Sequence, residues 1–194
     1  MFGNLLQLIV LFFVIFDPLL SAAVFFTASK KMRLRERKKT AFFAVSVAAL
    51  ISFIVLLSGN SILELFNTNI NDFRVAGGII LLILGVKMAL GVSITNPNQL
   101  QKNSSKALAA VIGTPLITGP AAITAIIIST SDYGILQTST AIAIVLAFTL
   151  VLLYALSTRS KMKGETAIQV LSTILGLVTI AWGIDFIRTG LLLA

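Results

Sequence analysis

The sequence contains no cysteine and no histidine, and only 11% of its 194 residues are charged. The missing cysteines exclude disulfides and thiol chemistry, and the missing histidines exclude imidazole metal ligands and imidazole proton relays. Soluble globular domains carry about 25% charged residues. Because this chain has too few polar side chains to cover a water-facing surface, its solvent is predicted to be the lipid bilayer.

Long apolar stretches take the place of the missing polar residues. The composition is 57% hydrophobic, and the mean hydropathy is +1.02. A bilayer core of about 30 Å needs roughly 20 helical residues. We therefore predict an all-α integral membrane protein, one transmembrane domain over residues 1–194, with six transmembrane helices at about 5–28, 40–58, 72–91, 107–129, 137–157 and 168–189.

The net charge of +8 is distributed unevenly along the chain. In a membrane protein such a charge reports topology rather than nucleic-acid binding. The basic residues gather in three connections, whereas Arg74 and Arg188 fall on the opposite side. The positive-inside rule then predicts cytoplasmic connections and both termini outside, in the cell (plasma) membrane. The three connections hold seven basic residues within 30–39, then Lys102 and Lys106, and then Arg159, Lys161 and Lys163.

One short stretch occurs twice. Residues 14–21 (VIFDPLLS) are similar to residues 111–118 (VIGTPLIT), and the offset of 97 is half of the chain length. Three spans per half is an odd number, so the second half would enter the membrane upside down. We predict two inverted-topology three-helix repeats, about 1–97 and 98–194. Chance recurrence of a short apolar motif is the alternative.

Prolines interrupt the first and fourth predicted helices. Pro18 lacks the N–H that would bond the carbonyl of Val14, and its ring crowds that carbonyl; Pro115 and Pro120 act in the same way. Asp-Pro and Thr-Pro also resemble the start of a new helix, a capping oxygen followed by proline. We therefore predict that helices 1 and 4 are discontinuous near the bilayer midplane. Simple kinks repaired by neighbouring helices are the alternative.

Non-helical backbone near the bilayer midplane is tolerated where it lines a polar cavity. Half-helix N-termini suit a carboxylate, while carbonyls and Asp17 suit an ammonium group. The predicted ligand is thus a small, net-neutral, dipolar solute such as a small amino acid. Two interpretations of Asp17 stay open: it is a substrate ligand or proton carrier, or it only caps a half-helix. The candidate substrate-binding residues are Asp17, Pro18, Ser21, Thr114, Pro115, Thr118, Gly119, Pro120, Ala121 and Thr124.

The remaining motifs indicate structural roles rather than catalysis or substrate binding. Gly77 and Gly78 are predicted to permit close helix packing rather than to touch substrate. Asp185 and Arg188, three residues apart, are predicted to form a surface ion pair. The sequence has no phosphate-binding loop and no pair of catalytic carboxylates within a span. We therefore expect no enzymatic activity, no cofactor and no metal site.

Three blocks resemble the MarC family of six-span membrane proteins, which includes the small neutral amino acid transporter SnatA. They are Asp17-Pro18 with Phe25, residues 73–79 (FRVAGGI) and residues 115–124 (PLITGPAAIT). The resemblance implies transport of glycine, alanine or threonine at a site formed by discontinuous first and fourth helices. The chain departs from the family pattern by losing glycine, asparagine, proline and glycine at Leu20, Ser21, Ala23 and Ala121, respectively.

The interpretation that joins these features is a secondary transporter of small neutral amino acids that works by alternating access. Coupling to a proton or to a sodium ion stays open, as does a homo-oligomeric state. Two alternatives remain, an efflux permease for another small metabolite and a non-transporting membrane scaffold. The expected partners are the amino acid and the lipid bilayer, and no nucleic acid.

Overall fold

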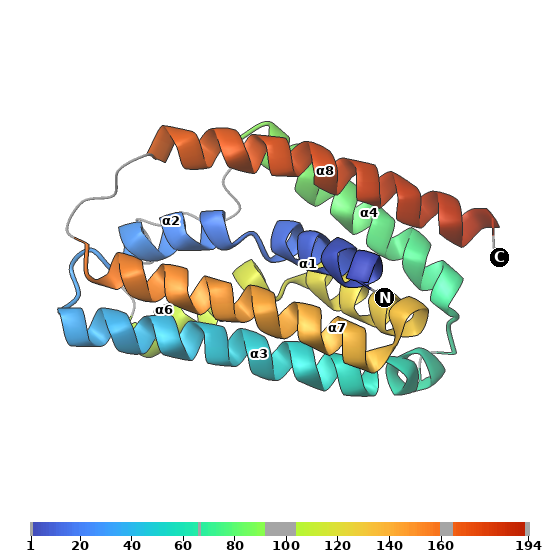
Figure 1. Cartoon of the computed structure of the whole chain (residues 1–194), viewed down its shortest axis with the longest axis horizontal. Helices are drawn as coiled ribbons and strands as arrows, with labels where there is room; N and C mark the ends of the chain where they lie inside the picture. Colours follow the sequence, from blue (N-terminus) through green and yellow to red (C-terminus); the bar gives the residue numbers. More distant parts are fainter. Residues whose placement is uncertain (1, 66, 92–103, 160–164, 193–194) are drawn as a thin grey trace.

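A computed structural model describes residues 2–65, 67–91, 104–159 and 165–192. Within these ranges the chain is all-helical, without strands, and most helices run roughly along the long axis of the molecule (Figure 1). The predicted repeat boundary near 97–98 and the basic residues Lys102, Lys161 and Lys163 lie outside the described ranges. The helices are α1 (Phe2–Phe16), α2 (Pro18–Ala28), α3 (Leu34–Leu65), α4 (Ile70–Ala89), α6 (Ser105–Val111), the π-helix η1 (Ile112–Ile117), α7 (Pro120–Ser157) and α8 (Glu165–Leu192).

Within the described ranges, four helical segments are long and apolar enough to cross a membrane: 4–28, 34–59, 120–157 and 170–192. Helix α4 has 20 residues but carries three charges, Asp72, Arg74 and Lys87. Helix α7 has 38 residues, about 57 Å at 1.5 Å per residue, which is nearly twice the bilayer core. It reverses direction at Gly134, whose φ of +81° is rare for residues with a side chain (Figure 1).

The second predicted span begins earlier than expected. Helix α3 starts at Leu34, so much of the basic segment that we predicted as a connection is helical. The Glu36 carboxylate accepts a hydrogen bond of 3.1 Å from the backbone N–H of Arg33, which caps the first turn. Arginine, lysine and glutamate are good helix formers, so the helix continues past the apolar segment.

The first predicted span is interrupted at Asp17. This residue adopts a left-handed conformation (φ 38°, ψ 69°), and Pro18 occupies the first turn of α2. The proline lies where a missing N–H costs least, because the first N–H groups of a helix have no intrahelical partner. The Asp-Pro prediction of a new helix start is therefore confirmed.

The fourth predicted span is interrupted differently from our expectation. Thr114, which is 97 residues after Asp17, is extended (φ −147°, ψ 122°), but no α-helix begins at Pro115. That proline lies in η1. There the backbone N–H of Thr118 donates to the carbonyl of Gly113 at 3.0 Å, a π-type bond between residues five apart that does not need an N–H from Pro115. The α-helix resumes only at Pro120, after Gly119 in an extended conformation. The Thr-Pro prediction of a helix start was wrong.

Helices α4 and α8 pack together along their length through glycines (Figure 1). A Cβ atom on Gly78 would lie 2.5 Å from the carbonyl oxygen of Gly183, and one on Gly85 would lie 2.7 Å from that of Gly176. The two backbones approach each other too closely for any larger residue. Such small-residue contacts are typical of helices that associate in a membrane, where no hydrophobic force draws them together.

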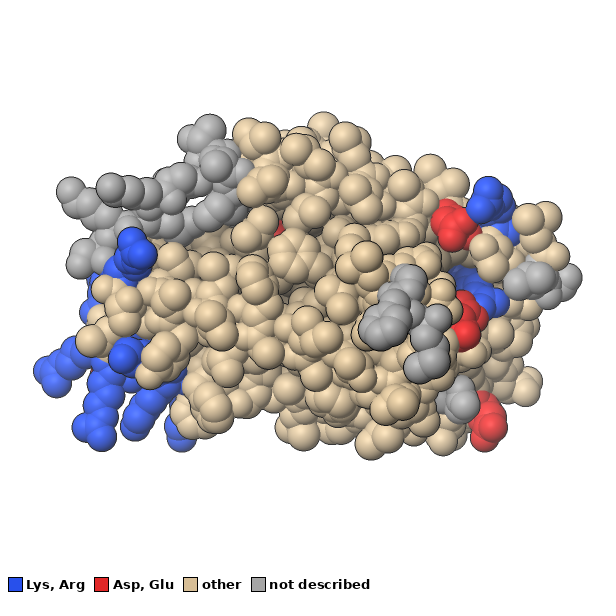
Figure 2. All heavy atoms as spheres, in the orientation of Figure 1, with Lys and Arg blue, Asp and Glu red and all other residues tan. Residues whose placement is uncertain are grey.

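The two ends of the molecule differ in charge. In Figure 2 one end shows only Lys and Arg, and the other shows both signs. We call the first the basic end; it holds the connection between α2 and α3. The second, called the far end, holds the chain reversal at Gly134, and both termini lie toward it (Figure 1). The predicted surface ion pair between Asp185 and Arg188 is confirmed there, at 2.6 Å.

One basic residue of the first connection is buried. Arg37 donates hydrogen bonds of 2.9 Å to the carbonyls of Leu156 and Arg159, and of 3.2 Å to the Ser29 hydroxyl. Its guanidinium also lies over the ring of Phe26. Because the last carbonyls of a helix lack intrahelical partners, Arg37 completes the C-terminal end of α7 and joins it to the α2–α3 connection.

Candidate functional site

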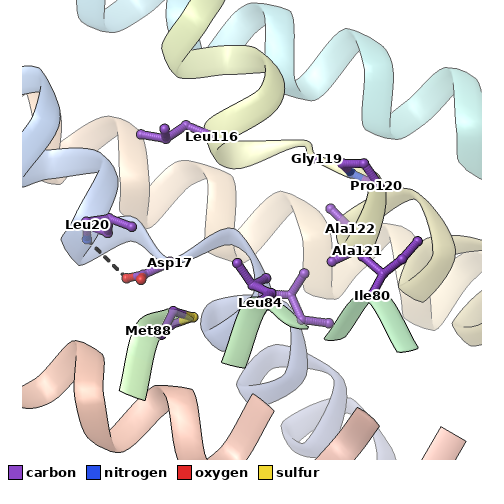
Figure 3. A pocket seen from close by; sticks show the side chains of 11 residues that line it. Asp17, Leu20, Ile80, Leu84, Met88, Leu116, Gly119, Pro120, Ala121 and Ala122 are labelled. Carbon is purple, nitrogen blue, oxygen red and sulfur yellow. Dashed lines mark hydrogen bonds between the residues drawn. The ribbon is translucent and has the colours of Figure 1, made fainter. Parts of the chain in front are cut away.

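The two helix interruptions meet at one cavity. Its volume is about 150 Å³, and its lining combines the first break, the second break and one face of α4. Figure 3 shows the Asp17 carboxylate on one side of this space and Pro120, Ala121 and Ala122 on another. We call it the deep cavity. Its lining residues are Ile15, Asp17, Leu20, Ile80, Leu84, Met88, Leu116, Gly119, Pro120, Ala121 and Ala122.

Among the described residues of that lining, Asp17 alone is charged. The residue is 5% exposed, and both carboxylate oxygens accept hydrogen bonds. Oδ1 accepts from the backbone N–H of Leu20 at 3.0 Å, which caps α2 (Figure 3), and Oδ2 accepts from the Ser172 hydroxyl of α8 at 3.0 Å. The carboxylate can accept further hydrogen bonds, since two oxygens offer about four lone-pair positions.

The other wall supplies backbone donors. Helix α7 begins at Pro120, and Gly119, its N-cap, makes no side-chain cap. The first N–H groups of a helix have no intrahelical partner, so the N–H groups of Ala121 and Ala122 are left for other acceptors. The positive end of the helix dipole lies at the same place. A carboxylate of Asp17 and an uncapped helix N-terminus therefore face one small space.

The third wall is apolar and comes from α4. Ile80, Leu84 and Met88 are spaced by four residues, which places them on one face of the helix. We did not predict them as site residues, although the spacing was visible in the sequence. Ser172, the partner of Asp17, lies 155 residues away from it and gave no local signal.

The predicted site residues separate into two groups. Asp17, Gly119, Pro120 and Ala121 line the deep cavity, whereas Pro18, Ser21, Thr114, Thr118 and Thr124 do not. The backbone of Pro115 lies in η1, and its side chain is outside the part of the chain that the structure describes.

Three of the predicted site residues outside the lining carry buried hydroxyl groups: Ser21, Thr118 and Thr124. Thr118 is fully buried and donates to the carbonyl of Ala48 at 3.3 Å, which fixes the second break against α3. Thr124 donates to the carbonyl of Pro120 at 3.0 Å, and its side chain fills the space beside Gly77. Ser21 is 1% exposed, and its hydroxyl has no hydrogen-bond partner among the described residues.

Comparison with known sequences identifies the family. The sequence profile described as "MarC family integral membrane protein" matches residues 2–194. The chain belongs to the MarC family. It is therefore an integral, multi-pass membrane protein.

Several MarC relatives are similar over most of their length. The chain is 31% identical to a UPF0056 membrane protein of Buchnera aphidicola subsp. Schizaphis graminum, over 90% of this chain and 85% of the relative. It is 29% identical to the UPF0056 membrane protein YhcE of Escherichia coli, over 92% and 87%. A UPF0056 membrane protein of Pyrococcus horikoshii is 38% identical over 74% and 73%. No solved structure matches the chain.

Proposed function

We propose that this MarC protein is a SnatA-like secondary transporter of small neutral amino acids such as glycine, alanine and threonine. The observation that carries the proposal is the pairing of Asp17 with the uncapped N-terminus of α7 across the deep cavity. The α-ammonium of the substrate would bind the Asp17 carboxylate. Its α-carboxylate would accept from the N–H groups of Ala121 and Ala122, as anions do at helix N-termini.

The size of the cavity supports a small substrate. A volume of about 150 Å³ holds about five water molecules at about 30 Å³ each. Glycine and alanine have a comparable number of non-hydrogen atoms. Drug-sized ligands need pockets of about 300–1,000 Å³. The wall of Ile80, Leu84 and Met88 gives a short aliphatic side chain an apolar contact and offers no partner to a charged one.

The arrangement that we propose around this site is six spans in two inverted three-helix repeats. The interrupted helices α1–α2 and α6–η1–α7 would be equivalent members of the two repeats. The arm of α7 before Gly134 would complete the fourth span, and the arm after it would be the fifth. Following the positive-inside rule, the basic end would face the cytoplasm and both termini the outside of the plasma membrane. Alternating access would then occur around the two breaks.

The test is uptake of radiolabelled glycine and alanine into proteoliposomes, with and without an imposed pH gradient. We expect saturable uptake by the wild type and its loss in Asp17→Asn, which keeps the size of the side chain but removes the charge that binds ammonium. Glu64→Gln is the matched control, because it makes the same carboxylate-to-amide change at an exposed position in the last turn of α3.

The outcomes separate the alternatives. Enhancement by the pH gradient would support proton coupling through Asp17, and enhancement by a sodium gradient instead would support a sodium site. Saturable uptake that Asp17→Asn does not change would reduce Asp17 to a helix cap. Folded wild-type protein without uptake would favour another metabolite or a scaffold role. In keeping with the absence of catalytic groupings in the sequence, no enzymatic step is part of the proposal.

A further inference from the structure

The outer surface between α3 and the arm of α7 that follows Gly134 carries an open groove. The two helices lie side by side (Figure 1). The groove has a volume of about 470 Å³, and its surface is mostly apolar. We call it the α3–α7 groove. Its lining residues are Phe53, Ser139, Thr140, Ala143, Ile144 and Ala147.

The chemistry of the groove suits an apolar chain. Ala143 and Ala147 are exposed and present only methyl groups. The hydroxyls of Ser139 and Thr140 both donate to the carbonyl of Leu136, at 3.1 and 2.7 Å. Because both hydroxyl hydrogens are used within the helix, an apolar chain can cover the groove without burying an unpaired donor.

Basic side chains gather on one face at the start of α3. Arg35, Lys38 and Lys39 are three and four residues apart, which places them side by side on the helix. We call them the basic face of α3. They belong to the basic end, where Figure 2 shows Lys and Arg without acidic side chains. Both salt bridges of the described residues lie at the far end, so no protein carboxylate pairs with this face.

A contact between Lys38 and Tyr154 aligns the basic face with the groove. The Lys38 ammonium lies 4.8 Å from the centre of the Tyr154 ring of α7, and tyrosine is typical of the level of the lipid headgroups. Ala147 precedes Tyr154 by seven residues, two turns on the same face of α7, and so lies about 10 Å deeper. Thr140 lies about 21 Å from Tyr154 by the same measure. Since half of a bilayer core is about 15 Å, the groove lies at the depth of acyl chains whose headgroups are level with Tyr154.

Charge distinguishes the occupants that such a groove could take in a membrane. A second copy of the chain, inserted the same way round, would bring its own basic end beside this one, and the like charges would repel. A lipid without net charge would fill the groove but leave the basic face unpaired. An anionic phospholipid supplies both the negative charge and the apolar chain, and basic clusters beside membrane spans attract such lipids.

From this alignment we propose that the basic face of α3, Tyr154 and the α3–α7 groove form a binding site for one anionic phospholipid. Its phosphate would accept hydrogen bonds from the basic face, and one acyl chain would lie in the groove. The bound lipid would join the start of α3 to the end of α7 on the outer surface, as Arg37 joins the same region from within. The site is separate from the deep cavity, so this inference does not depend on transport.

The test is native mass spectrometry of the purified full-length protein, titrated with phosphatidylglycerol or with phosphatidylcholine of the same acyl chains. We expect one phosphatidylglycerol to bind at least about 10-fold more tightly than phosphatidylcholine, because each basic side chain near an anionic surface strengthens binding about 5-fold. Lys38→Gln/Lys39→Gln should remove most of this preference. Lys30→Gln/Lys31→Gln is the matched control, since it removes the same charge at the same end but outside α3, and it should change the preference by no more than about 2-fold.

A second variant tests the groove itself. The ring of Ala147→Phe would occupy the space of the acyl chain, and the loss of about ten carbon–carbon contacts should weaken phosphatidylglycerol binding by about 5-fold or more. Ala181→Phe makes the same change at an exposed position of α8 and should leave binding unchanged.

Four results would overturn the proposal. Equal affinity of the wild type for the two lipids would exclude an anionic site. An equal loss of preference in the two lysine variants would show diffuse attraction to the basic end rather than a site. Unchanged lipid binding in Ala147→Phe would exclude the groove. A wild-type dimer that Ala147→Phe converts to a monomer would assign the groove to a second copy of the chain.

Discussion

The contact between α4 and α8 makes a sharp prediction for Gly78→Ala. The added Cβ would lie 2.5 Å from the carbonyl oxygen of Gly183 and 2.6 Å from Cγ1 of Ile187. The first neighbour is backbone, which cannot rotate away as a side chain can. To reach an ordinary contact, the helices would have to separate locally by about 1 Å, and a gap of that size forfeits about a quarter to a half of the dispersion energy of the contacts it opens.

The magnitude follows from two opposing effects. Overpacking a tight contact costs about 1–3 kcal/mol, and the rigidity of the backbone neighbour places this site in the upper part of that range. Alanine is a better helix former than glycine by about 1 kcal/mol, which offsets part of the loss. We therefore expect Gly78→Ala to lower the free energy of unfolding by about 1–2 kcal/mol.

The assay is reversible unfolding in mixed micelles, with Gly59→Ala as the matched control. A Cβ atom on Gly59 would lie 3.1 Å from Cγ1 of Ile127, a side-chain atom that can adjust. This variant should be at least as stable as the wild type, because the gain in helix propensity of about 1 kcal/mol offsets the small adjustment of the Ile127 side chain. The double variant Gly78→Ala/Gly183→Ala should lose less than the sum of the two single losses, because the two glycines face each other. Equal stability of Gly78→Ala and Gly59→Ala would refute the close-packing argument.

Two further variants test polar contacts away from the glycines. Arg37→Gln should lower the free energy of unfolding by about 2–4 kcal/mol, because it removes charged hydrogen bonds to the carbonyls that end α7; Arg35→Gln, at an exposed position, should change it by no more than about 0.5 kcal/mol in the same assay. Ser172→Ala should lower stability by about 1 kcal/mol and tighten alanine binding at the deep cavity, because it frees one oxygen of Asp17; loss of binding would instead make Ser172 a ligand.

Local signals in the sequence predicted the helices and the first break. Apolar length indicated the helical segments, and the Asp17-Pro18 pair indicated a new helix start, because a capping oxygen and a missing N–H act on adjacent residues. The same rule failed at Thr114-Pro115. There the chain uses a π-type turn, and the helix begins five residues later at Pro120. A choice between two nearby prolines depends on packing against α3, which no local pattern records.

The local Asp185–Arg188 pair was predicted, but the polar contacts between distant helices could not be, for a related reason. Asp17 meets Ser172 across 155 residues, and Arg74 meets Asp132 across 58. Charge and depth marked Asp17 as a candidate site residue, but nothing in the sequence named its partner. Arg74 was predicted to report topology and stands in one of the MarC-like blocks, but it was not a candidate site residue. Its burial and its ion pair with Asp132 depend on how α4 packs against α7, which no local pattern records.

Both of these pairs tie α4 or α8 to the rest of the bundle. Asp17 of the first break bonds Ser172 of α8, and Asp132 of α7 pairs with Arg74 of α4. A ligand can shift a conformational equilibrium only by the difference between its binding free energies in the two states. In the proposed mechanism the substrate ammonium competes with Ser172 for Asp17. Substrate binding would therefore loosen the tie between the first break and α8, whereas the apolar contacts of the glycine-packed α4–α8 pair with its neighbours would respond little to a zwitterion.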